Sequence, residues 1–297
     1  MKNFELKNYL EENRKRVEQT LEKLLPSEKE WPVRLHESML YSIRAGGKRL
    51  RPILTIAACE ACGADTERVL PVAAAIEMIH TYSLIHDDLP AMDDDALRRG
   101  KPTNHKIFGE AVAILAGDAL LTEAFRIMSR YRHPEVPASV LIDVIESIAE
   151  ASGSKGMAGG QVVDLESEDQ KIDLEKLENL HRHKTGRLIR ISVEAGAKLA
   201  GGNPSQVEAL GLYGEKIGLA FQIADDVLDI EGGEEIGKDI GSDVANHKST
   251  YPSLLGLEAS KQKAKQLVAE AVRLLENFDV KADPLREIAQ YVANRKN

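Results

Sequence analysis

Apolar residues recur at intervals of three or four along most of the chain, and this spacing predicts helices. Between residues 4 and 24 they are interspersed with charges, as expected for an amphipathic helix that ends before Pro26. Further helices are expected at residues 32–43, 71–89, 109–130, 135–151, 174–200, 206–230, 258–277 and 283–294. Alternating, strand-like runs are scarce, so the pattern predicts an all-α protein.

Nothing in the chain marks a boundary between domains. The 297 residues contain no Ser/Pro-rich linker, no internal repeat and no low-complexity tract. Glycine and proline fall singly or in pairs between the expected helices. We therefore expect a single domain over residues 1–297 with a sizeable core.

The charge balance and the apolar runs exclude two classes of protein. The formal net charge is −9, whereas a nucleic-acid surface calls for a basic face, so we expect no nucleic-acid partner. No apolar run reaches the roughly 18 residues of a membrane span, and the N-terminus is charged without a signal-peptide core. The sequence therefore predicts a cytoplasmic protein with no membrane span.

Two cysteines occur, Cys59 and Cys62, at a spacing that could form half of a zinc or redox site. A second cysteine pair and a nearby histidine are missing, and alanines surround the two thiols in an expected helix. We therefore interpret both as reduced core thiols that bind no metal.

Five aspartates lie within the nine positions 87–95, at the end of the helix expected at residues 71–89 and just beyond it, and Arg98, Arg99 and Lys101 follow them. Carboxylates in this density favour hard divalent cations, and the basic residues favour phosphate, so the segment suggests a metal-bridged diphosphate. The members of the cluster that we expect to bind metal are Asp87, Asp88 and Asp93.

Helix geometry gives the first acidic cluster an orientation. His80, Ser83 and Asp87 share one stripe of the helix, at about 100° per residue, so a polar line leads toward the aspartates. Pro90 ends or kinks the helix, which should let Asp93 turn back toward Asp87. A solvated acidic loop at a helix end is the alternative interpretation of this segment alone.

A second acidic cluster, in the sequence FQIADDVLD, places Asp225, Asp226 and Asp229 within roughly a third of one helix circumference. Three like charges on the flank of an apolar helix repel one another unless a cation is bound. Because Mg2+ typically takes only one or two carboxylates together with phosphate oxygens and water, two such clusters could grip several ions between them.

These motifs resemble those of the trans-isoprenyl diphosphate synthase family. DDLPAMD at residues 87–93, RRGKPT at 98–103 and DDVLD at 225–229 carry the likeness, which covers nearly the whole chain. Four further blocks match in order: GGKRLRP at 46–52, GQVVDL at 160–165, HKTG at 183–186 and GKDIGSD at 237–243. The resemblance implies the isoprenoid synthase fold, an antiparallel helix bundle around a deep central cavity, and a homodimer.

The resemblance also implies a reaction and roles for individual residues. The reaction is the Mg2+-dependent head-to-tail (1'-4) condensation of an allylic diphosphate with isopentenyl diphosphate, with several Mg2+ per site and Mn2+ as an alternative. Isopentenyl diphosphate is assigned to the Gly47 loop with Lys48, Arg51, His80 and Arg99. The allylic diphosphate is assigned to Arg98, Lys184, Lys238 and Lys248, and the allylic cation to Thr185 and Gln222.

Product length is expected to depend on Tyr82 and Ser83, which precede the first acidic cluster. The family resemblance supplies this step, since an aromatic residue five positions before the first motif is typical of the farnesyl synthases of the bacterial and plant branch. The product implied is the fifteen-carbon farnesyl diphosphate. A geranylgeranyl diphosphate synthase and a non-catalytic subunit of a heteromeric synthase are the alternatives. The sequence gives Asp118, Gln161 and Asp164 no clear role.

Overall fold

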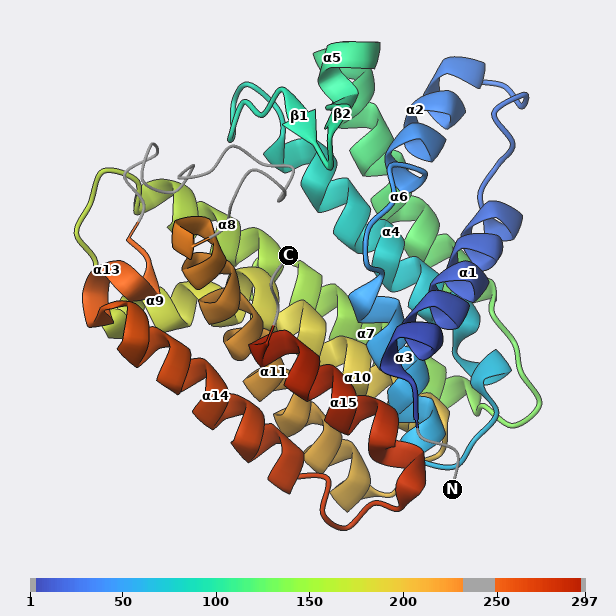
Figure 1. Cartoon of the computed structure of the whole chain (residues 1–297). Coiled ribbons are helices and arrows are strands. Elements are labelled where there is room, and N and C mark those ends of the chain that lie inside the picture. The colour runs from blue at the N-terminus through green and yellow to red at the C-terminus, as the bar shows by residue number, and fades with distance from the viewer. Residues whose placement is uncertain (1–3, 232–248, 295–297) are drawn as a thin grey trace.

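The computed structural model describes residues 4–231 and 249–294, and almost all of their regular structure is helical (Figure 1). The all-α prediction is therefore confirmed. The helices are α1 Leu6–Leu24, α2 Val33–Ile43, α3 Leu50–Ala61, α4 Leu70–Asp87, α5 Asn104–Phe108, α6 Glu110–Arg130, α7 Ala138–Ser152, α8 Met157–Glu166, α9 Leu174–His181, the π-helical turn η2 Arg182–Gly186, α10 Arg187–Leu199, α11 Pro204–Glu231, α13 Tyr251–Leu255, α14 Leu257–Arg273 and α15 Asp283–Ala293, with short 3-10 turns η1 Thr66–Arg68 and η4 Val280–Ala282.

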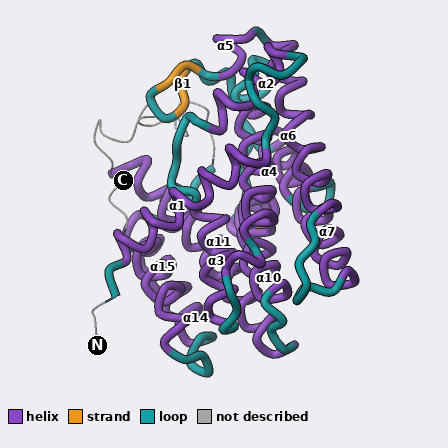
Figure 2. The backbone as a smooth tube through the Cα atoms, turned by 90° about the vertical axis from the view of Figure 1, so that its right-hand side faces the viewer, coloured by secondary structure: helices purple, strands orange, loops and turns teal. Residues whose placement is uncertain are grey.

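Two local features depart from the helical pattern. The helix expected over residues 174–200 is interrupted by η2, so that α9 and α10 are separate α-helices. A short hairpin also follows the first acidic cluster, in which β1 Leu97–Arg98 pairs antiparallel with β2 Lys101–Pro102 (Figure 2). Its two turn residues, Arg99 and Gly100, have φ of 54° and 73°, as a type I′ turn requires.

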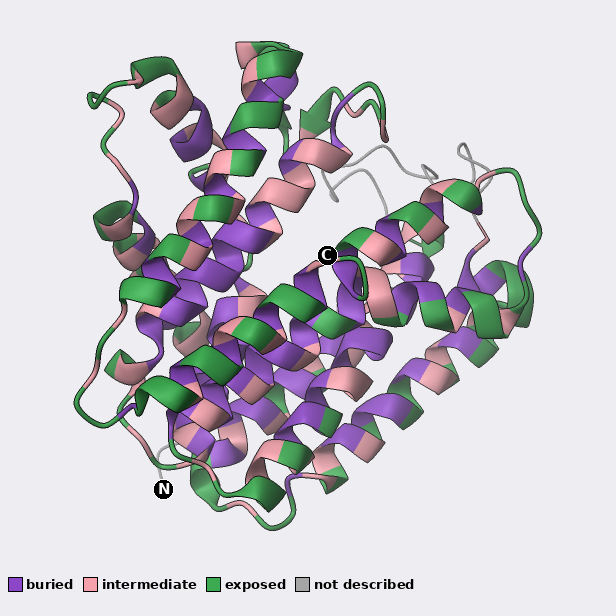
Figure 3. Cartoon of the chain, turned by 180° about the vertical axis from the view of Figure 1, so that it is seen from behind, coloured by how far each residue is buried: buried purple, intermediate pink, exposed green. Residues whose placement is uncertain are grey.

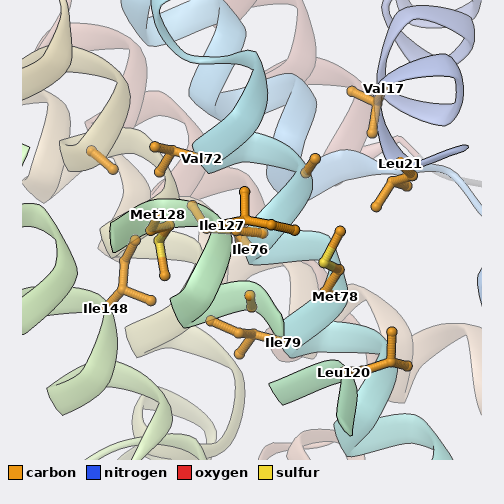
Figure 4. Close-up of a cluster of buried hydrophobic side chains, with 14 of the residues drawn as sticks. Val17, Leu21, Val72, Ile76, Met78, Ile79, Leu120, Ile127, Met128 and Ile148 are labelled. Carbon is orange, nitrogen blue, oxygen red and sulfur yellow. The ribbon is translucent and has the colours of Figure 1, made fainter. Parts of the chain in front are cut away.

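The core consists of two hydrophobic clusters that share α3 and α10. Ile56 and Ile191 belong to the first cluster, with α1, α2, α4, α6 and α7. Figure 4 shows apolar side chains of α4 in this cluster, among those of α1, α6 and α7. Ile53 and Val193 belong to the second, with α11, α14 and α15. Figure 3 shows buried residues on the inner sides of the helices and exposed residues on the outer faces.

The two shared helices approach each other to backbone contact. A Cβ atom at Gly196 of α10 would lie 2.2 Å from the carbonyl oxygen of Thr55 in α3, so only glycine fits this crossing. Cys59 is fully buried on α3, as expected of a core thiol, and its Sγ lies 3.4 Å from the carbonyl oxygen of Asp65. Burial raises the pKa of Cys59 to about 12 and that of Cys62 to about 11.

A cavity of about 440 Å³ opens between α1, the end of α3 and α15, which lie close together in Figure 2. Phe4, Tyr9, Glu60 and Lys281 are among the residues that line it, and none of the residues that the sequence assigns to the site does so. Among the described helices, none is long and apolar enough to cross a membrane.

Candidate active site

The end of α4 brings two aspartates of the first cluster together. α4 ends at Asp87, and the backbone N–H of Asp93 donates to the carbonyl oxygen of Asp87 at 2.9 Å. The predicted return of Asp93 toward Asp87 is therefore confirmed. Burial raises the pKa of Asp87, the ammonium of Lys184 opposes this shift, and the negative charge of Asp93 adds to it.

Asp88 points to the hairpin instead. Arg98 Nε donates to Asp88 Oδ1 at 2.5 Å, and Arg98 Nη2 contacts Asp95 Oδ2 at 3.0 Å. Burial raises the pKa of Asp88 to about 6, although the guanidinium of Arg98 opposes the shift. The hairpin therefore holds Arg98 as the counter-ion of an aspartate that is almost fully buried.

Arg51, His80 and Arg99 lie close enough together for the charges of the two arginines to act on each other and on His80. Burial lowers the pKa of Arg51 to about 10, while the carboxylates of Glu77 and Asp225 oppose this shift. Burial also lowers the pKa of His80 well below its usual value, and the charges of Arg51 and Arg99 add to the effect. His80 is therefore a neutral imidazole among cations at neutral pH.

The glycine pair before α3 makes room for one of these cations. Gly47 has φ of 122°, and a Cβ atom there would lie 2.4 Å from Cζ of Arg99. The guanidinium of Arg99 donates to the carbonyl oxygen of Gly46. Lys48, from the same loop, has its Nζ 5.8 Å from the ring centroid of Tyr291 on α15.

A buried ion pair beside Arg51 and Arg99 was missed by sequence reasoning. Arg49 Nη1 donates to Glu77 Oε1 at 2.8 Å, and the two side chains are 1% and 2% exposed. Arg49 has φ of 50° and precedes α3. The signal was available in the sequence, because Glu77 is a lone acid within the apolar run of α4 and needs a buried partner.

The π-helical turn η2 places Lys184 and Thr185 between two other helices. Lys184 Nζ donates to Asp164 Oδ2 on α8 at 2.6 Å. Thr185 Oγ1 donates to Gln222 Oε1 on α11 at 3.0 Å. The structure thus brings together three residues that the resemblance assigned to the site and one, Asp164, for which it gave no role.

The three acids of α11 do not share one set of neighbours. Asp226 is buried, accepts a hydrogen bond from the backbone N–H of Tyr251 at 2.9 Å and lies 3.7 Å from His181 Nε2. Asp225 lies near enough to Arg51 to affect its pKa, and Asp229 is half-buried. The sequence places all three acids within a third of the helix circumference. Adjacent residues in that arc still point in directions about 100° apart, and Asp226 faces α13.

The acidic side chains of the site suit a hard metal ion, although those that the structure describes form no closed cage for one. Within residues 4–231 and 249–294, no three His, Cys, Asp or Glu side chains converge on one point as a metal cage requires. The carboxylates nevertheless suit hard cations that keep only one or two protein ligands and take the remainder from phosphate and water. The residues therefore fit a metal that arrives with a diphosphate.

The remaining residues named from the sequence lie as follows. Tyr82 is partly buried and packs against the first hydrophobic cluster, with its ring centroid 5.7 Å from that of His86. Ser83 Oγ donates to the carbonyl oxygen of His80 at 2.9 Å. Asp118 is 59% exposed, with Oδ1 4.0 Å from His86 Nε2. Lys238 and Lys248 lie outside the described residues.

The chain is similar over almost its whole length to several known proteins. The farnesyl diphosphate synthase of Geobacillus stearothermophilus is 49% identical over 296 residues, which cover 99% of each chain. The geranylgeranyl diphosphate synthase of Cyanophora paradoxa is 50% identical over 99% of this chain and 98% of that protein. A crystal structure of an FPP/GFPP synthase from Zymomonas mobilis, 42% identical, superposes with a TM-score of 0.87 and covers 97% of this chain and 98% of its own.

The structural similarity confirms the predicted isoprenoid synthase fold, whereas the depth of its central cavity stays a prediction. The model of the polyprenyl synthetase family matches residues 32–290, which include every block that carried the resemblance. The chain belongs to the polyprenyl synthetase family.

Proposed function

We propose that the protein is a prenyltransferase that makes farnesyl diphosphate from isopentenyl diphosphate with dimethylallyl or geranyl diphosphate. The observation that carries the proposal is the presence of cations beside two different residues of α4. Arg51 and Arg99 lie beside the neutral His80, and Lys184 lies close to Asp87. Two diphosphate substrates need cations at two places, and the full-length similarity to a farnesyl diphosphate synthase supports the assignment.

The acidic residues would hold several Mg2+, with Mn2+ as the alternative. Asp87, Asp88 and Asp93 would serve from one side, and Asp225, Asp226 and Asp229 from the other. When bound, the metal withdraws charge from the allylic diphosphate and favours cleavage of its C1–O bond. Asp88 and Asp226 also accept hydrogen bonds, from Arg98 and from the backbone N–H of Tyr251.

The side chains would then guide three steps. Lys184 and Arg98, with Lys238 and Lys248, neutralise the departing diphosphate. The allylic cation lies beside the Thr185 hydroxyl. This hydroxyl donates its hydrogen bond to Gln222, so the lone pairs of the Thr185 oxygen remain available to the cation. Lys48, Arg51, His80 and Arg99 hold isopentenyl diphosphate so that its double bond attacks C1. A carbon–carbon bond forms, and the released diphosphate accepts the proton that leaves.

A turnover assay tests the function. The purified chain is incubated with Mg2+, isopentenyl diphosphate and either dimethylallyl or geranyl diphosphate, and the product length is measured. We expect farnesyl diphosphate from both allylic substrates. A twenty-carbon main product would favour the geranylgeranyl synthase, a function that the similarity to the Cyanophora paradoxa enzyme also supports. No turnover by this chain alone would favour the non-catalytic subunit.

A substitution of Tyr82 tests whether this side chain limits the length of the product. The tyrosine ring is partly buried five positions before Asp87, which corresponds to roughly 7 Å along the helix, or about one isoprene unit. We expect Tyr82→Ala to lengthen the main product to twenty carbons or more at unchanged metal dependence. Tyr82→Phe is the matched control, because it keeps the ring and should keep the fifteen-carbon product. A folded, active Tyr82→Ala enzyme that still stops at fifteen carbons would place the limit elsewhere.

We also propose that residues 1–297 form one polyprenyl synthase domain and that the protein is a homodimer. Side chains of α3 and α10 enter both hydrophobic clusters, which supports one domain. Ile114 and Leu115 of α6 are 43% and 56% exposed, and such adjacent apolar residues suit a partner of the same kind. The molar mass measured by light scattering, in wild type and in Leu115→Lys, tests the dimer.

A further inference from the structure

Asp164 is a buried acid that accepts a hydrogen bond from a residue of the proposed site. Lys184 Nζ donates to Asp164 Oδ2 at 2.6 Å, and the side chains are 24% and 12% exposed. The charges of both Lys184 and Asp164 act on the pKa of Asp87, so the three groups lie close together. The ammonium of Lys184 therefore lies close to two carboxylates from different helices, that of Asp87 at the end of α4 and that of Asp164 on α8.

The backbone around this pair is built to bring α8 against the π-helical turn. A Cβ atom at Gly160 of α8 would lie 2.3 Å from the backbone nitrogen of Lys184 and 2.6 Å from its Cα. On the opposite side, a Cβ atom at Gly218 of α11 would lie 3.0 Å from Cα of Gly186. The turn that carries Lys184 is thus held between two helices at backbone contact distance.

A second polar group of α8 faces the same region. Gln161 lies one turn before Asp164 on the same helix face and is 9% exposed. Both polar atoms of its amide are buried and have no hydrogen-bond partner among the described residues. Since buried amides are rarely left unpaired, the polar face of α8 is not explained by packing alone.

We propose that Asp164 is a positioning residue for Lys184. It fixes the ammonium beside Asp87, so that the long side chain does not have to be ordered when a diphosphate binds. An ammonium has three N–H donors, so Lys184 can keep its hydrogen bond to Asp164 while it donates to the diphosphate. The inference rests on the proposed function, because it assumes that Lys184 acts on a diphosphate leaving group.

The test is a double-mutant cycle on this pair. Asp164→Asn keeps the shape of the side chain and removes its charge. We expect it to lower kcat by about tenfold while the KM values of both substrates change less than about threefold. In the Lys184→Ala background the same substitution should change kcat by less than about twofold, because Asp164 acts only through Lys184.

The melting temperature gives a second readout that needs no turnover. Asp164→Asn should lower it in the wild type, where an ion pair is lost. It should lower it much less in the Lys184→Ala background, where the ion pair is already lost. If Asp164→Asn does not fold, Asp164→Ser is used in the same cycle.

Asp143 supplies the matched control. Its Oδ2 accepts from Lys198 Nζ at 2.8 Å, a similar pair near the other end of α10, and Asp143→Asn should leave kcat unchanged. A tenfold loss of kcat on Asp164→Asn in both backgrounds would overturn the inference, as would an equal fall in melting temperature in both. A wild-type chain without prenyl transfer refutes the proposed function instead, and the temperature cycle then still decides whether Asp164 holds Lys184.

Discussion

Several charged side chains in the interior of the described part of the protein are paired with an opposite charge. Arg49 pairs with Glu77, Asp88 with Arg98 and Asp164 with Lys184. Glu60 is different, because its recorded partner is the neutral hydroxyl of Tyr9, which donates to Oε2 at 2.7 Å. An ionised carboxylate there is stabilised less than one that is paired with a cation.

Glu60 should make stability depend on pH. Burial raises the pKa of Glu60 above its ordinary 4.5, and the Tyr9 hydrogen bond opposes the shift. The folded protein therefore holds this proton to higher pH than the unfolded chain does. The corresponding stability is present below pH 4.5 and is lost as the pH rises through the raised pKa. Glu60→Gln should melt higher than wild type near pH 7, and the difference should vanish near pH 4.

Thermal melts of both proteins across this pH range check the prediction. Glu11→Gln is the control, because Glu11 is fully exposed and its pKa is lowered by Lys15, so its removal should not raise the melting temperature near pH 7. A Glu60→Gln protein that melts below wild type at neutral pH would show that the Tyr9 hydrogen bond outweighs the burial of the charge.

At this scale the sequence predicted which residue types gather but not every partner. Asp87, Asp93, Arg51, His80 and Arg99 could be named because motif and spacing suffice. Which carboxylate each cation meets depends on side-chain direction in three dimensions, so the contacts Asp226 to Tyr251 and Arg49 to Glu77 were not foreseen.

At the scale of elements, the packing of α8 and α11 against the π-helical turn η2 depends on glycines. Gly160 meets the backbone of Lys184, and Gly218 meets that of Gly186. Side-chain periodicity predicted a continuous helix here, because one extra residue in a turn barely disturbs an apolar stripe. The β1–β2 hairpin was missed for a related reason, since two residues per strand give no alternation to detect.

Gly160→Ala should therefore damage the site through the backbone. The new methyl group would lie 2.3 Å from the Lys184 nitrogen, and overpacking of this kind costs about 1–3 kcal/mol. We expect a lower melting temperature and a kcat reduced about tenfold or more, since Lys184 and Thr185 move with the turn. Circular dichroism melts and turnover measure both quantities.

Gly186→Ala is the matched control in the same turn. Its backbone is helical, with φ of −63°, and the nearest atom to an added Cβ lies at 3.5 Å. Alanine is favoured over glycine in a helix by up to about 1 kcal/mol, so this variant should be as stable as wild type or more so. Equal damage from both substitutions would mean that the close contact of Gly160 with Lys184 is not the cause of the damage.

At the scale of the whole molecule, the two acidic groups belong to different parts of the core. Asp87 ends α4, which packs in the first hydrophobic cluster, and Asp225 lies on α11, which packs in the second. α3 and α10 pack against each other and join the clusters, because α3 also contacts α4 and α10 also contacts α11 (Figure 1). The helical pattern predicted the elements of this arrangement. It could not predict that one helix pair serves both clusters, because no local spacing encodes long-range contacts.

Metal and diphosphate together should therefore stabilise the folded chain more than either alone. A ligand that binds only the folded state adds about 2.7 kcal/mol at a concentration one hundred times its Kd. We expect Mg2+ with inorganic diphosphate to raise the melting temperature by several degrees, roughly 2–4 °C per kcal/mol. Asp225→Asn should abolish most of this increase if α11 contributes to the bound metal. Retention of the full increase in Asp225→Asn would confine binding to the α4 side.

The burial of Cys59 and Cys62 has a practical consequence for spectroscopy. With pKa values raised to about 12 and about 11, neither thiol forms an appreciable thiolate at neutral pH, and the thiolate is the form that reacts with maleimides. The chain has no other cysteine. New cysteines at two exposed positions, Leu97 on the hairpin and Val162 on α8, would therefore accept a donor and an acceptor dye in the otherwise native protein. Energy transfer between the two dyes would then compare the separation of the hairpin and α8 in the free protein and in the protein with metal and diphosphate bound.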